Sequence, residues 1–212
     1  MFMQLLKLAL ICSIGVFAST SSASVDELCS KTDRSKEHAA LINGLQLDEV
    51  TKCSQEGDAV ALNELGVRYG TGKGAKKDSK RSFENYLAAA GLGDTQSKFN
   101  LGFMYHGGEG TAQDYPLAIR WLNEAANEGS ASAQHLLGYI YATGEGADKN
   151  GSLAEKWFLA AAKQGNVLSQ QALIRFYSDG ELVPKNLDEA VKWTHRARDA
   201  NLYGEVWRES DK

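Results

Sequence analysis

Aromatic and apolar residues recur along this chain at a fixed interval of 36 residues. The recurring aromatic residues are Trp121, Trp157 and Trp193, together with Tyr69, Tyr105, Tyr141 and Tyr177. At this period the chain divides without insertion into four blocks, residues 57–92, 93–128, 129–164 and 165–200, in which leucine, glycine and alanine also recur. A fixed period of about 20 to 50 residues is typical of solenoids, so the pattern predicts a stack of repeats.

Each block contains the signals of two helices. The second position is always a strong N-cap residue: Asp58, Asp94, Ser130 or Asn166. Apolar residues then follow at helical spacing, as in Leu62, Leu65 and Tyr69, until a glycine-rich stretch such as residues 69–74 ends the helix. A second set of caps precedes the second helix, at Asp78, Asp114, Asn150 and Asn186. Each block therefore predicts a helix–turn–helix unit.

Three of the predicted first helices carry an internal glycine, at Gly66, Gly102 and Gly138. Glycine inside a helix costs about 1 kcal/mol relative to alanine. Its recurrence predicts a close approach of the two helices that a Cβ atom would prevent. The fourth block has Ile174 at this position and Leu182 in place of a loop glycine, a departure typical of a terminal repeat.

The pattern of the second block resembles the Sel1-like repeat, a relative of the tetratricopeptide repeat. The matching residues are Leu101-Gly102, Tyr105, Gly108, Gly110, Asp114, Ala118, Trp121 and Ala125-Ala126, and residues 129–164 match as closely. The resemblance covers 144 of 212 residues. It implies an all-α, right-handed α-solenoid of antiparallel helix pairs. It also implies a role as an adaptor or scaffold that holds proteins, often in an exported bacterial protein.

Both ends of such a stack are expected to be capped, because an open end exposes core. Residues 24–56 predict an N-terminal helical cap. Its apolar residues Leu41, Ile42, Leu45, Leu47 and Val50 are expected to face the first repeat. Residues 201–212 predict a short C-terminal capping helix, in which Leu202 with Val206 and Tyr203 with Trp207 form i,i+4 pairs.

Residues 1–23 resemble a secretory signal peptide. Lys7 precedes a short apolar run over residues 8–17, and small residues at 21–23 offer a cleavage site. The run is shorter than a membrane span needs, which disfavours the alternative of an uncleaved anchor. Export leaves Cys29 and Cys53 in an oxidising compartment, so we predict a disulfide between them. The alternative is a pair of reduced, buried thiols.

The charge and motif content exclude several functions. With 23 basic and 27 acidic residues, the net charge of −4 offers no electrostatic basis for nucleic-acid binding. The chain contains no G-x-S-x-G, H-E-x-x-H or S-x-x-K motif, and residues 70–74 lack the ending of a phosphate-binding loop. The four histidines are too dispersed for a dedicated metal site, although His106 and His135 leave an adventitious metal open. We expect neither a cofactor nor a catalytic residue.

The resemblance to tetratricopeptide arrays implies that the fourth, seventh, eleventh and fourteenth positions of each block line a concave groove. Seventh and eleventh positions lie on one helical face. The predicted partner-binding residues are Phe99, Phe103, His106, His135, Tyr139, Gln171 and Arg175. Aromatic and arginine side chains are enriched at binding hot spots. The alternative for Phe99 and Phe103 is that they pack between adjacent repeats.

Taken together, these features predict a periplasmic or secreted adaptor that binds another protein in its groove. The partner would be an envelope component, or a toxin if the protein confers immunity. The alternative is a secreted hydrolase or penicillin-binding protein of the weak β-lactamase type, as described for disulfide-rich relatives. Those relatives carry a disulfide in each repeat, whereas these four repeats contain no cysteine.

Overall fold

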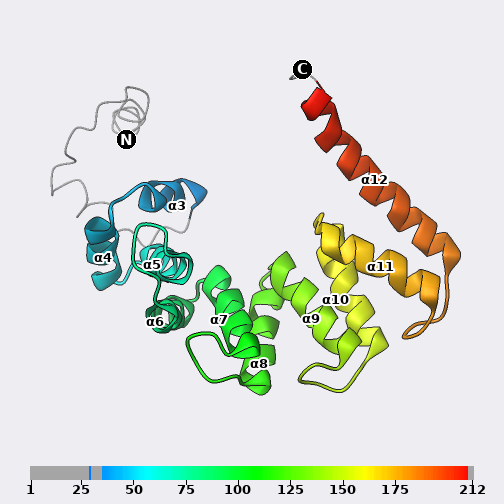
Figure 1. Cartoon of the computed structure of the whole chain (residues 1–212), viewed down its shortest axis with the longest axis horizontal. Helices are drawn as coiled ribbons and strands as arrows, with labels where there is room; N and C mark the ends of the chain where they lie inside the picture. The colour runs from blue at the N-terminus through cyan, green and yellow to red at the C-terminus, as the bar shows by residue number, and fades with distance from the viewer. Residues whose placement is uncertain (1–28, 30–34, 210–212) are drawn as a thin grey trace.

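The computed structural model describes Cys29 and residues 35–209, in which all regular secondary structure is helical. The helices are α3 (Lys36–Asn43), α4 (Leu47–Gln55), α5 (Ala59–Thr71), α6 (Ser79–Gly91), α7 (Thr95–Gly107), α8 (Tyr115–Asn127), α9 (Ala131–Thr143), α10 (Gly151–Lys163), α11 (Val167–Asp179) and α12 (Leu187–Glu209). Helices α5 to α12 pack as four successive pairs, and each pair packs on the next. Figure 1 shows the pairs following one another in a curved array, so the predicted all-α solenoid is confirmed.

The helix ends are set by the residues that the sequence pattern predicts. Each of the eight predicted N-cap side chains accepts a hydrogen bond from a backbone N–H of its helix: Asp58, Asp78, Asp94, Asp114, Ser130, Asn150, Asn166 and Asn186. The first helix of each repeat ends at a glycine with φ between 68° and 79°, namely Gly72, Gly108, Gly144 and Gly180. The glycine-rich stretch at residues 70–74 is thus a helix-ending turn.

The helical glycines lie where the two helices of a repeat are closest. A Cβ atom at these positions would lie 2.5–2.6 Å from a side chain of the paired helix. The pairs are Gly66 with Tyr86, Gly102 with Leu122 and Gly138 with Phe158. This confirms the predicted close approach. The equivalent positions of the fourth repeat hold Ile174 and Thr194, so there the larger side chain belongs to the first helix.

Helices α3 and α4 cover the start of the stack. Ile42, Val50 and the disulfide-bonded pair of Cys29 and Cys53 form one buried cluster with Val60, Ala61 and Leu65 of α5. The predicted disulfide is therefore present, and Leu45 and Leu47 pack against the same cluster as expected. The expectation for Leu41 is wrong, because its side chain is exposed. The buried residues of α3 are His38 and Ile42, one turn apart, and Leu41 lies about 100° around the helix from Ile42, at the edge of the buried side.

A buried polar pair connects this cap to the first repeat. His38 Nε2 lies 2.7 Å from Asp58 Oδ2, and both side chains are only 2% exposed. Asp58 also caps α5, because its other oxygen accepts hydrogen bonds from the N–H groups of Val60 and Ala61. The cap is thus held by the same carboxylate that begins the first repeat.

The C-terminal end differs from the expectation of a separate helix at residues 201–212. Helix α12 runs without a break to Glu209 and extends well beyond the other helices in Figure 1. In the preceding junctions a glycine with φ between 86° and 97° follows the helix, at Gly57, Gly93, Gly129 and Gly165. The fourth repeat has Asn201 at this position and lacks the signal that ends a helix. The pairs formed by Leu202, Tyr203, Val206 and Trp207 lie outside the described side chains.

Residues 1–23, the predicted signal peptide, lie outside the described residues. Within the described part of the chain, Cys29 and Cys53 are joined, a bond typical of oxidising compartments. None of the helices described is both long and apolar enough to cross a membrane.

Candidate functional site: a groove between α9 and α11

A groove of about 500 Å³ lies between the first helices of the third and fourth repeats, α9 and α11. Four of the seven predicted partner-binding residues line it: His135 and Tyr139 from α9, and Gln171 and Arg175 from α11. They come together because seventh and eleventh positions share a helical face, and consecutive first helices lie side by side in the stack. The sequence pattern thus predicts the two long walls of this groove.

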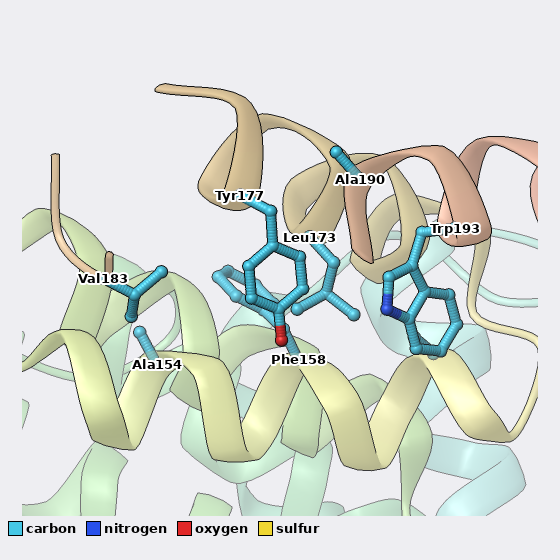
Figure 2. Packing of buried hydrophobic residues seen from close by; sticks show 8 residues of the cluster. Ala154, Phe158, Leu173, Tyr177, Val183, Ala190 and Trp193 are labelled. Carbon is cyan, nitrogen blue, oxygen red and sulfur yellow. The ribbon is translucent and has the colours of Figure 1, made fainter. Parts of the chain in front are cut away.

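The floor of the groove is apolar and belongs to the core. Phe158 of α10 is buried, and its ring centroid lies 5.6 Å from that of His135 and 5.5 Å from that of Phe176. Figure 2 shows Phe158 within the buried cluster that also contains Leu173 and Tyr177. Because this cluster is shared by the third and fourth repeats, the groove rests on packed side chains that resist rearrangement.

His135 is held in place by a contact across the repeat junction. Its Nδ1 lies 2.8 Å from the Ser169 hydroxyl of α11, and burial lowers the pKa of His135 below its usual value of 6.5. The imidazole is therefore neutral at neutral pH. Ser169 is fully buried, so its hydroxyl faces His135 and is not presented to a molecule in the groove. This geometry disfavours the Ser169–His135 pair as a nucleophile with its base.

The exposed wall residues offer a surface of mixed character. Tyr139 is 42% exposed, and Leu168, which is not among the predicted partner-binding residues, is 60% exposed. The Arg175 side chain is 84% exposed, and its Nε lies 3.3 Å from Asp179 Oδ2. Leu168 occupies the fourth position of its block, one of the positions that the resemblance to tetratricopeptide arrays assigns to the groove, so the positional pattern contains its signal.

The other three predicted residues lie outside this groove. Phe99 packs against the core shared by the second and third repeats, and its ring centroid is 6.5 Å from that of Phe103, which is 52% exposed. The His106 ring lies edge-on to Tyr115, and its Nε2 is 3.7 Å from Glu145 Oε1 in the loop of the next repeat. His106 and His135 therefore do not meet, and the described residues contain no group of three metal-ligating side chains.

Seventh-position residues join one repeat to the next. The Ser97 hydroxyl donates to Asn63 Oδ1 over 3.0 Å, in the same way that Ser169 contacts His135. In both pairs the seventh position of one repeat meets the fifth position of the following repeat. The seventh position is thus partly used for stacking, whereas the eleventh positions of the second, third and fourth repeats remain accessible.

Comparison with known proteins agrees with this architecture. A crystal structure of c5321, a protective antigen of uropathogenic Escherichia coli strains displaying an SLR fold, is 28% identical with a TM-score of 0.73. The match covers 83% of this chain and 41% of that one, so the chain spans about two fifths of that protein's length. A Sel1 repeat protein from Oxalobacter formigenes is also 28% identical, with a TM-score of 0.65 over 73% of this chain and 70% of that one.

A third structure, a putative Sel1 repeat protein from Klebsiella pneumoniae, shares the fold alone. It is 20% identical with a TM-score of 0.51, over 78% of this chain and 84% of that one. No curated protein sequence matches the chain. The family model of the Sel1 repeat matches residues 59–94, 95–130, 131–166 and 172–202. Because these consecutive matches span more than half of the chain, the protein belongs to the Sel1 repeat family.

Proposed function

We propose that this protein is an adaptor that binds a partner protein through the groove between α9 and α11. Sel1 repeats are protein-interaction modules, and solenoids bind through extended surfaces of this kind. The observation that carries the proposal is the groove itself. Tyr139, Leu168 and Arg175 stand exposed around a rigid apolar floor, and aromatic and arginine side chains supply much of the energy at interfaces.

Variation among the repeats supports this choice. Residues that recur in every block, such as the caps and the turn glycines, have structural roles in the fold. The eleventh position, in contrast, changes from Val67 to Phe103, Tyr139 and Arg175 along the stack. A position that varies while the fold repeats is suited to recognising one particular partner.

We also propose that the protein acts outside the cytoplasm, in the periplasm or after secretion. The sequence of residues 1–23 resembles an export signal, and the buried disulfide supports an oxidising environment. In that compartment the partner would be an envelope component or an incoming toxin, and the protein would accordingly be a scaffold or an immunity protein.

The proposal is tested by affinity capture from the native envelope, with the wild type compared with Tyr139→Glu/Arg175→Glu. Leu87→Glu serves as the control, because Leu87 is also exposed but lies on α6, away from the groove. All three proteins must first show equal helicity by circular dichroism. We expect a partner that wild type and the control retain and the double variant loses. A toxin as that partner indicates immunity, and an envelope component indicates a scaffold.

Equal retention of the partner by all three proteins would place binding elsewhere on the surface and refute the groove as the binding site.

The alternative function, hydrolysis, is tested with a chromogenic β-lactam. We expect no turnover above the buffer blank, because the buried Ser169 hydroxyl cannot reach a substrate in the groove. Turnover that disappears in His135→Gln would contradict the adaptor assignment.

A further inference from the structure

We propose that the groove accepts an extended peptide segment that carries an apolar side chain at one end and a lysine or arginine at the other. This inference rests on the proposed function, because it specifies the partner of the same groove. It follows from an asymmetry along the groove, whose two ends differ in hydrophobicity and in charge.

The length of the groove is set by α11. Leu168 lies at its beginning and Asp179 at its end, which corresponds to about 16 Å along a helix axis. An extended chain advances about 3.3 Å per residue, so about five residues would span the groove. A volume of about 500 Å³ accommodates a few side chains of one segment.

The beginning of the groove is apolar. Leu168 is more exposed than any other large apolar residue among the described side chains, at 60%. His135 lies on the opposite wall at this level, because its Nδ1 contacts Ser169, the residue next to Leu168. Phe158 lies beneath His135, and Tyr139 lies one turn further along α9. Covering Leu168 with an aliphatic or aromatic side chain removes apolar surface from water on both partners and favours binding at this end.

The opposite end is negative. Asp179 and Glu181 line it, and the single positive group in the lining, Arg175, already contacts Asp179. The lining therefore carries a net charge of −1, since His135 is neutral. Lys149 and Lys185 belong to adjacent loops, where their side chains lie against Gly144 and Gly180, and neither lines the groove.

Helix dipoles add to this negative end. Both α9 and α11 end there, at Thr143 and Asp179, and both of these residues line the groove. The C-terminus of a helix carries about half a negative charge from its unsatisfied carbonyl groups. Two such termini together with Asp179 and Glu181 favour a cation, so the basic residue of the peptide belongs at this end.

The probe for this inference is a phage library of random seven-residue peptides. The library is selected on the wild-type protein at low salt and counter-selected on Tyr139→Glu. We expect the retained peptides to share an apolar residue and, about three to five positions away, an enriched lysine or arginine. Enrichment of acidic residues, or of apolar residues without a basic one, overturns the inference and leaves groove binding intact. If no peptide distinguishes wild type from Tyr139→Glu, both the inference and the proposed function fail.

The charge at the far end is then tested with the most enriched peptide by fluorescence anisotropy. Glu181→Lys should weaken binding about fivefold at low salt, and this loss should shrink at high salt. Glu84→Lys makes the same change in net charge at an exposed site on α6 and should leave the affinity unchanged. A peptide whose basic residue is replaced by glutamate should bind Glu181→Lys better than wild type. Equal affinity of wild type and Glu181→Lys for the basic peptide refutes the inference.

Discussion

At the scale of residues, the same two positions hold an ion pair in the second repeat and an amide–amide hydrogen bond in the third. Each pair gives a buried polar side chain a partner. In the second repeat, Lys98 of α7 is nearly buried and pairs with Glu128. The same positions of the third repeat hold Gln134 and Gln164, whose amides bond over 2.8 Å. These two repeats thus contain matched polar pairs, one charged and one neutral.

This pairing predicts a compensating double variant. Lys98→Gln should lower the free energy of unfolding by about 1 kcal/mol, because Glu128 loses its charged partner. The double variant Lys98→Gln/Glu128→Gln should recover most of that loss, since it reproduces the pair of the third repeat. Urea unfolding of the wild type, both single variants and the double variant measures the coupling. Strictly additive losses would show that the two side chains act independently.

The half-buried imidazole of His135 predicts a pH dependence of stability. Its pKa is lowered in the folded state by burial, so below about pH 6.5 the unfolded chain binds a proton that the folded protein does not. The contribution of His135 is therefore complete above pH 6.5 and is lost as the pH falls through the lowered pKa of the folded state.

His135→Gln retains a polar group for Ser169 and removes this titration. The wild type should lose more unfolding free energy between about pH 7.5 and about pH 5 than His135→Gln does. The other histidines are common to both proteins and cancel in the comparison. Parallel pH profiles of the two proteins would contradict this account.

At the scale of elements, the junctions between repeats depend on matched sizes. The loop glycine Gly146 lies against Tyr115, the first residue of α8, where a Cβ atom would come within 2.3 Å of the ring. In the junction between the third and fourth repeats the large and small residues change places: the loop carries Leu182 in place of glycine, and α10 begins with Gly151 in place of tyrosine. Leu182 replaces the loop glycine in the fourth repeat, and it fits because Gly151 of the third repeat replaces the bulky residue that it would otherwise meet.

Gly151→Ala tests this exchange. Its Cβ atom would lie 2.0 Å from the carbonyl oxygen of Leu182, a backbone atom that cannot move alone. We expect a loss of about 1–3 kcal/mol in unfolding free energy, the usual effect of overpacking. Gly91→Ala is the matched control, because nothing lies within 4 Å of the added methyl group and alanine favours helix. The control should be as stable as wild type or slightly more stable.

At the scale of the whole molecule, the core consists of successive clusters, each shared by neighbouring units of the curved array (Figure 1). The first cluster joins the cap to α5 and includes both cysteines, whereas the cluster beneath the groove belongs to the third and fourth repeats. In such a linear array each unit contacts only its neighbours. A defect at one end should therefore have little effect at the other.

The disulfide tests this independence. Replacing Cys29 and Cys53 by serine should remove about 3 kcal/mol of stability, as expected for a closed loop of this length. Binding of the selected peptide to the groove should remain unchanged under conditions in which the variant is folded. Urea unfolding and fluorescence anisotropy measure the two effects. A parallel loss of stability and affinity would indicate coupling along the whole stack.

The sequence alone determined the features that depend on local interactions repeated at a fixed period. Caps, turn glycines and close-packed helical glycines act within one helix pair, so the same residues predict the same geometry in every block. The walls of the groove follow as well, because the helical spacing of His135 with Tyr139, and of Gln171 with Arg175, is local.

Only the tertiary structure decided the features that depend on a neighbouring repeat or on the remaining surface. It buried part of His135 against Ser169, left Leu41 exposed and packed the half-buried Phe99 against the core, outside the groove. It also brought Asp179 and Glu181 to the end of a groove formed with α9. Exposure and net charge at a site are sums over side chains from several helices, and a period of 36 residues does not specify which of them meet.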